Sequence, residues 1–162
     1  MKNNKPLDGI KVIEISTIIT ASLSAMMLAD QGAEVIKIEQ TGFGDPLRYL
    51  GTQKGGVSAI FANVNRGKSS LELDLKKDAD LNSAKKLICE ADVLINNFRP
   101  GVMEALGLSK AECKKINKNL IYVAITGFGK EGPFSNSPAY DHVVQAMSGA
   151  TAIQSDGDKP QY

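Results

Sequence analysis

Short apolar runs alternate with helix-like stretches along most of this chain. Five of the runs are rich in Val, Ile and Leu and have the length of strands that lie inside a sheet. These predicted strands are residues 11–15, 34–38, 70–75, 92–96 and 120–126. The predicted helices are residues 21–30, 57–64, 78–89, 102–106, 109–116 and 141–148. Strands separated by helices predict an α/β fold with a mainly parallel sheet and helices on both faces.

Residues that begin and end helices mark several of these boundaries. Thr17 or Thr20 is predicted to cap the first helix. Ser109 and Glu112 have the spacing of a capping box, and Gly149 is placed to end the last predicted helix.

The run at 120–126 is almost continuously apolar, which is typical of a strand buried on both faces. A loop rich in glycine and proline follows it, and Tyr140-Asp141 then opens the last predicted helix. Ligands of open α/β sheets bind outside the carboxyl ends of the strands, so we expect the polar loops 17–22, 97–101 and 127–141 to line one crevice. On these residues alone, a simpler interpretation of Asp141 is preferred, in which it caps or charge-stabilises its helix.

The first predicted strand, helix and strand form a βαβ unit of the kind that binds dinucleotides. Glu39 stands at the end of the second strand, where such folds place the acid that binds a ribose. The turn 16–22 contains no glycine, however, so the G-x-G-x-x-G motif is absent and binding of NAD or FAD is not expected. The connection 40–56 is long and dense in glycine, which indicates a functional or mobile segment.

Few other side chains indicate chemistry on their own. Lys76 and Arg99 are candidate phosphate ligands, although a surface cation is the commoner interpretation of each. Phe98 could stack on a base or belong to the core. His142, the one histidine of the chain, adjoins Asp141, but adjacent helix positions do not face each other. The residues alone therefore predict a polar crevice that binds an anion.

Composition and charge narrow the class of protein. The 162 residues are 43% hydrophobic and 23% charged, with a net charge of +1, which fits one globular domain and argues against nucleic acid as a partner. One histidine and two cysteines, Cys89 and Cys113, without CxxC spacing argue against a protein-ligated metal. No apolar run reaches the ~20 residues of a membrane span. We therefore expect no membrane partner and a cytoplasmic protein with reduced thiols.

Seven short segments occur in an order that identifies a family. They are LDGIKVIEIS, ADQGAEVIKIE, GDPLR, NRGKSSLELDLK, ADVLINNFRPGVMEALGL, INKNLIYVAITGFGKEGP and AYDHVVQAMSG. In this order they resemble the family III CoA-transferases of the CaiB/BaiF type, which include carnitine CoA-transferase, formyl-CoA transferase and α-methylacyl-CoA racemase. The resemblance implies a Rossmann-like large domain, a small domain and a homodimer of interlocked chains. It also implies transfer of CoA between an acyl-CoA and a carboxylic acid through an aspartyl-CoA thioester.

The resemblance covers only the amino-terminal part of that large domain. Residues 1–162 are therefore expected to be its CoA-binding α/β portion, without the remainder of the large domain or the small domain. The nucleophilic aspartate of the family lies in a later G-D motif, beyond Tyr162, and Asp156 and Asp158 lack that context. The chain alone is thus expected to be inactive and to expose apolar surface that partner segments cover. A truncated, catalytically inactive CoA-binding remnant is the alternative.

The resemblance also assigns positions that contact CoA. They lie after the first two strands, in the L-D-L-K segment, in the N-F-R-P-G motif and just beyond it: Ile18, Ile19, Thr20, Gln40, Leu73, Asp74, Leu75, Lys76, Asn97, Phe98, Arg99 and Ala105. The sequence departs from the family at Gln40 and Ala105, where basic residues are common, and at 20–22, where A-G-P is common.

Tyr140 and Asp141 match the active-site pair of the family, and the resemblance implies that they position the acyl group or stabilise intermediates. Racemases of the family carry His-Asp at this pair, and the histidine is one of their acid–base groups. A tyrosine, with an ordinary pKa near ~10, does not replace it readily. The resemblance therefore favours a CoA-transferase, with an acyl-CoA racemase as the alternative, and leaves the acid and the acyl donor unidentified.

Overall fold

The computed structural model describes residues 5–155, 157 and 159. Asp156 and Asp158 lie outside the described residues. The chain divides into two compact units, Met1–Ile125 and Thr126–Tyr162, and each is described by itself.

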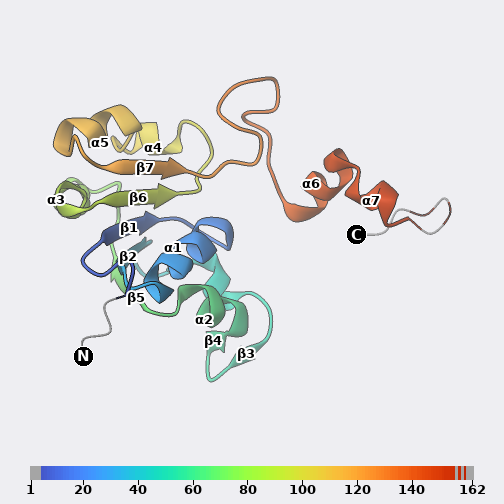
Figure 1. The fold of residues 1–162 in the computed structure, drawn as a ribbon, viewed down its shortest axis with the longest axis horizontal. Helices are drawn as coiled ribbons and strands as arrows, with labels where there is room; N and C mark the ends of the chain where they lie inside the picture. Colours follow the sequence, from blue (N-terminus) through green and yellow to red (C-terminus); the bar gives the residue numbers. More distant parts are fainter. Residues whose placement is uncertain (1–4, 156, 158, 160–162) are drawn as a thin grey trace. The chain divides into compact units, whose positions relative to one another are not determined.

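The first unit is built on a five-stranded sheet in the order β5-β2-β1-β6-β7 (Figure 1). Each neighbouring pair in this sheet is parallel, which confirms the prediction of a parallel α/β sheet. Its strands are β1 Lys11–Ile15, β2 Glu34–Glu39, β5 Lys68–Glu72, β6 Val93–Asn96 and β7 Ile121–Ala124. A separate antiparallel pair consists of β3 Gln53–Lys54 and β4 Val57–Ser58.

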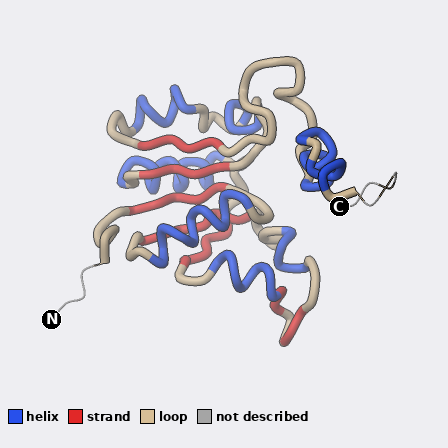
Figure 2. The backbone as a smooth tube through the Cα atoms, turned by 45° about the vertical axis from the view of Figure 1, so that its right-hand side comes forward, coloured by secondary structure: helices blue, strands red, loops and turns tan. Residues whose placement is uncertain are grey.

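Helices cover both faces of this sheet, as predicted (Figure 2). The helices of the first unit are α1 Thr20–Asp30, α2 Ala59–Asn65, α3 Asp78–Glu90, α4 Val102–Ala105 and α5 Lys110–Ile116. On one face, Val12 of β1 packs in a cluster with Ala21 and Ala25 of α1. On the other face, Ile13 of the same strand packs in a cluster to which α3, α4 and α5 contribute, including Ile88. The alternation of side chains along β1 thus divides the core into two layers.

Two strands differ from their predictions, and both lie at the edges of the described sheet. The strand predicted at 70–75 is β5, which ends at Glu72 and is largely exposed. Leu73 and Leu75 follow the strand and pack against the core from a loop, so the alternating pattern of SLELDL was not that of a single strand. The strand predicted to be buried on both faces is β7, an edge strand of the described sheet, where Ile121 is 59% exposed and the other three residues are half-buried.

Several local predictions concern helix ends. Ser109 and Glu112 form the predicted capping box. The residue before α1 is Ile19, and no side chain caps that helix, so the prediction of a threonine cap was wrong. The connection 40–56 is partly ordered by the short 3-10 helix η1 Pro46–Tyr49, which the sequence analysis did not predict; Asp45 caps it.

In the second unit, the described residues form two short helices, α6 Asp141–Ser148 and α7 Ala150–Ile153. Gly149 ends α6 in the left-handed conformation, as predicted, and α7 begins directly after it. The loop before α6 is pinched at its base, where a Cβ on Gly127 would come within 1.9 Å of the Ala139 Cβ.

Candidate functional site

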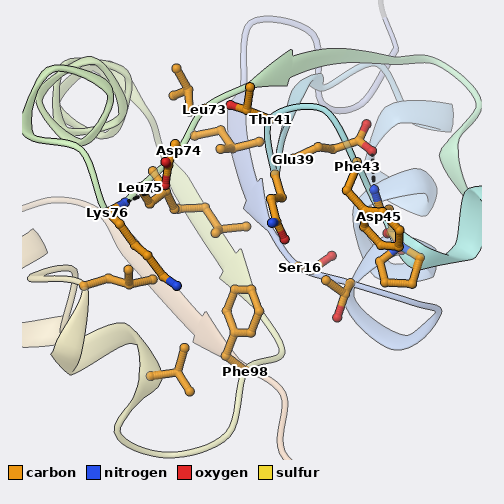
Figure 3. A pocket seen from close by; sticks show the side chains of 18 residues that line it. Ser16, Glu39, Thr41, Phe43, Asp45, Leu73, Asp74, Leu75, Lys76 and Phe98 are labelled. Carbon is orange, nitrogen blue, oxygen red and sulfur yellow. Dashed lines mark hydrogen bonds between the residues drawn. The ribbon is translucent and has the colours of Figure 1, made fainter.

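A cavity of the first unit lies at the carboxyl ends of the central strands and has a volume of about 430 Å³. This is within the size range of small-molecule sites. Six of the predicted CoA contacts line it: Gln40, Leu73, Asp74, Leu75, Lys76 and Phe98. Figure 3 shows Lys76 and Phe98 on one side of the cavity, with Phe43 and Asp45 on the other.

The other predicted contacts in this unit do not line the cavity: Ile18, Ile19, Thr20, Asn97, Arg99 and Ala105. Close neighbours of several of them do. Ser16 and Thr17 line it just before Ile18, and Val102 and Leu106 line it on either side of Ala105. The matched segments therefore adjoin the cavity, but in these segments the residues that line it lie one to three positions from the matched ones.

Asn97 holds the loop between β1 and α1. Its side-chain oxygen accepts a hydrogen bond from the Thr17 amide at 3.1 Å, and its side-chain nitrogen donates to the Thr17 carbonyl at 2.7 Å. The same nitrogen donates to the Thr20 hydroxyl at 3.1 Å. This asparagine therefore holds one wall of the cavity in place. That structural role was not predicted from the sequence.

A cluster of four charged side chains lies beneath this loop. Lys37 Nζ is 2.6 Å from Glu14 Oε1 and 3.0 Å from Asp45 Oδ2, and Lys68 Nζ is 2.7 Å from Glu14 Oε2. Each of these side chains is at most 2% exposed. The hydroxyl groups that also bond to Glu14 belong to Ser16 and Ser22. The two carboxylates balance the two ammonium groups, which is the arrangement that buried charges require.

Burial and charge act in opposite directions on this cluster. Burial alone would raise the pKa of Glu14, but Lys37 and Lys68 outweigh it and hold that pKa below its ordinary value. Burial lowers the pKa of Lys68, and Glu14 offsets part of this effect.

This cluster was not predicted, although the sequence contains a signal for it. The runs KVIEI and EVIKI each carry a charge at the fourth of five otherwise mostly apolar positions. Glu14 and Lys37 are direct partners in the parallel register of β1 and β2. Opposite charges at matching places in two buried strands could have predicted their ion pair.

Glu39, which stands where dinucleotide folds bind a ribose, is engaged within the protein. Its Oε1 accepts from Arg48 at 2.6 Å and from Ser70 at 2.7 Å, and its Oε2 accepts from Arg48 and from the Asp45 amide, both at 2.8 Å. Burial opposes ionisation, but these donors prevail and lower the pKa of Glu39 to about 2. Gly44 has a φ of 69° and leaves no room for a Cβ, which would approach the Arg48 side chain at 2.9 Å. Glu39 thus secures the segment that follows β2.

Tyr140 and Asp141 belong to the second unit and are both exposed, Tyr140 by 64%. Asp141 occupies the first turn of α6, where its charge suits the helix dipole, and accepts a hydrogen bond from Gln145. No side chain makes a capping hydrogen bond there. The geometry therefore fits stabilisation of the helix by the charge of Asp141 but not capping by its side chain. An active-site role for Tyr140 and Asp141 stays a prediction.

Over residues 5–155, 157 and 159, no group of three or more His, Cys, Asp or Glu side chains is placed to hold a metal ion. Within the same residues, no helix has the length and apolar character needed to cross a membrane.

Comparison with known proteins gives consistent matches. A family model described as CoA-transferase family III matches residues 7–162. The chain is 45% identical over 148 residues to the acetyl-CoA:oxalate CoA-transferase of Acetobacter aceti, covering 91% of this chain and 38% of that protein. It is 37% identical over 154 residues to the succinyl-CoA:glutarate CoA-transferase of Homo sapiens, covering 94% of this chain and 35% of that protein.

A solved structure agrees with these sequence matches. The crystal structure of a CAIB/BAIF family protein from Brucella suis has a TM-score of 0.92 and 37% sequence identity, and the match covers 99% of this chain and 44% of that one. The chain thus spans less than half the length of each of these relatives.

Proposed function

Because the chain belongs to CoA-transferase family III, we propose that its first unit binds the CoA moiety of an acyl-CoA for transfer to a carboxylic acid. The observation that carries this proposal is the cavity at the carboxyl ends of the strands, which is lined by the segments that match the family's CoA contacts. The relatives named acetyl-CoA:oxalate and succinyl-CoA:glutarate CoA-transferase support transfer over racemisation.

The lining of the cavity suits the parts of CoA. Leu73, Leu75 and Phe98 offer apolar surface to the uncharged portions of the ligand. Lys76 supplies an exposed ammonium group at the cavity, which attracts phosphate as a point charge. Arg99 is exposed just beyond it and is assigned to a phosphate that extends outside the cavity.

The proposed chemistry is nucleophilic catalysis by an aspartate. The carboxylate attacks the thioester carbonyl of the acyl-CoA, so that a mixed anhydride forms and CoA leaves as a thiolate. The thiolate then attacks the aspartyl carbonyl, which releases the first carboxylic acid and leaves an aspartyl-CoA thioester. The acceptor acid reverses these two steps. Tyr140 and Asp141 are assigned to positioning the acyl group or stabilising these intermediates.

The aspartates at the cavity do not suit the nucleophile. Asp45 is buried against Lys37, and Asp74 accepts a hydrogen bond from the Lys76 amide and lies near Lys77. We therefore assign the nucleophile to the later motif of the family, beyond Tyr162. The proposal accordingly takes the 162-residue chain to bind CoA without transferring it, and the whole enzyme to be a cytoplasmic homodimer.

Calorimetric titration of CoA into the purified chain tests this proposal. We expect saturable binding at one site, weakened about tenfold by Lys76→Ala, because a charge-assisted hydrogen bond contributes about 1.5–3 kcal/mol and this lysine is exposed. Arg99→Ala should weaken binding in the same direction. Lys86→Ala is the matched control, since Lys86 is an exposed lysine on α3 that does not line the cavity. NAD in place of CoA should give no binding.

A folded wild-type chain without heat of binding would contradict the proposal. Equal losses in Lys76→Ala and Lys86→Ala would mean that CoA is attracted only by the general charge of the surface, which would also contradict the assigned site.

A further inference from the structure

The loop between β1 and α1 contains an unusual backbone conformation. Ile18 has a φ of 66°, the one positive φ at a residue other than glycine in the described ranges 5–155, 157 and 159. A β-branched residue adopts this left-handed conformation rarely, and it persists only where surrounding contacts impose it. The neighbouring Ser16 and Thr17 line the cavity.

Asp45 and Asn97 impose this conformation from two sides. The Asp45 carboxylate accepts a hydrogen bond from the Ile18 amide at 3.0 Å through Oδ1, while Asn97 binds both the amide and the carbonyl of Thr17. The same Asp45 oxygen accepts from the Leu47 amide at 2.9 Å. One carboxylate thus joins the loop after β1 to the segment after β2, and both contribute to the wall of the cavity.

Asp45 is itself held in place by buried charges. Its side chain is 0% exposed, and its second oxygen lies 3.0 Å from Lys37 Nζ. Lys37 is fixed in turn by Glu14, and Glu14 by Lys68. Oδ1 of Asp45 is held by two backbone amides, whereas Oδ2 accepts no hydrogen bond among the described residues and is held by the charge of Lys37.

We propose that Asp45 is a positioning residue for CoA binding, which transmits the rigidity of the buried charge cluster to the cavity wall formed by the loop after β1. The inference rests on the proposed function. Its loss should alter the cavity wall, because Asp45 lines the cavity and accepts the Ile18 amide of the adjoining loop.

Asp45→Ala and Asp45→Asn separate positioning from general stability. Alanine removes the acceptor of the Ile18 and Leu47 amides, so CoA affinity should fall at least about tenfold and amide hydrogen exchange at both residues should accelerate. Asparagine keeps an oxygen at the Oδ1 position, so it should retain slow exchange at both amides and most of the affinity. It also removes the charge that faces Lys37, so it should lower the melting temperature as alanine does, which separates the loss of charge from the loss of the acceptor.

Asn117→Ala is the matched control for lost stability. Asn117 donates to three backbone carbonyls at the end of α3, those of Ile88, Cys89 and Ala91, and does not line the cavity. Its loss should lower the melting temperature without changing CoA affinity. If Asp45→Ala does not fold, Asn97→Ala provides the second variant. It releases Thr17 without leaving a buried charge, and should likewise weaken CoA binding.

Unchanged CoA affinity in folded Asp45→Ala or Asn97→Ala would overturn the inference, as would slow exchange of the Ile18 amide in Asp45→Ala. An Asn117→Ala variant that loses as much affinity would also overturn it, because general destabilisation would then explain the effect. Absence of CoA binding by the wild-type chain contradicts the proposed function instead, and the exchange measurements then decide alone whether Asp45 holds the loop.

Discussion

Replacement of Glu39 by glutamine tests the energetics of the segment that forms one wall of the cavity. Four donors bind the Glu39 carboxylate, two of them from Arg48, and its pKa falls from an ordinary 4.5 to about 2. This difference corresponds to roughly 3 kcal/mol of stabilisation of the charged form. Because the Arg48 side chain is 36% exposed, solvent screening reduces the expected loss in Glu39→Gln to about 2 kcal/mol at pH 7.

The pH dependence gives this prediction a definite sign. A carboxylate whose pKa is depressed in the folded state contributes stability that is complete above its unfolded value, here 4.5, and that is lost as the pH falls toward 2. The difference in free energy of unfolding between wild type and Glu39→Gln should therefore shrink between pH 5 and pH 2. Urea denaturation followed by circular dichroism measures it, and urea is preferred because guanidinium salts screen charges.

Glu90→Gln is the matched control for this experiment. Glu90 pairs with Lys11 at 3.5 Å, but the two side chains are 73% and 47% exposed, and exposed pairs contribute about 0–1 kcal/mol. A Glu39→Gln variant as stable as Glu90→Gln at pH 7 would refute the reasoning. A difference from wild type that does not change with pH would refute it equally.

Three further predictions concern other parts of the chain. Gly127→Ala should open the base of its loop, because the new Cβ would lie 1.9 Å from that of Ala139, and limited proteolysis between them should accelerate. Cys89 is exposed, whereas Cys113 is buried and burial raises its pKa to about 11. A thiol reagent at pH 8 should therefore modify Cys89 alone until the protein unfolds. Rapid modification of both cysteines in the folded protein would contradict this prediction. Asn117→Ala should lower the free energy of unfolding by about 1–3 kcal/mol in urea titrations, and an unchanged midpoint would contradict it.

The sequence predicted the central strands well because each is a mostly apolar run that contains no turn residue in its interior. Residues 11–15 were predicted without error, and the second strand lacked only Glu39. The edge strands were less predictable, since Ile121 is as apolar as a core residue and nothing local distinguishes a strand with one neighbour from a strand with two. The hydrophobic pattern describes the residues of one strand, whereas their burial depends on the strands and helices that pack against that strand.

The candidate site was predicted at the level of segments. The L-D-L-K match located Leu73 to Lys76 at the cavity, and the N-F-R-P-G match located Phe98 there. In the loop after β1, Ser16 and Thr17 line the cavity in place of the matched Ile18, Ile19 and Thr20. Ile18 there adopts a left-handed conformation that an isoleucine side chain gives no reason to predict. The charge cluster around Glu14 could be predicted only after the first two strands were paired in register, because that pairing places Glu14 beside Lys37.

The most direct test of the account is a map of backbone amide shifts in the NMR spectrum of the chain as CoA is added. The account predicts that the largest shifts lie at Thr17, Gln40, Phe98 and residues 73–76, which come from four separated segments and meet only at the cavity. It also predicts small shifts along α3, away from the cavity. Shifts confined to exposed lysines, or centred on segments that do not line the cavity, would contradict the claim that this cavity binds CoA.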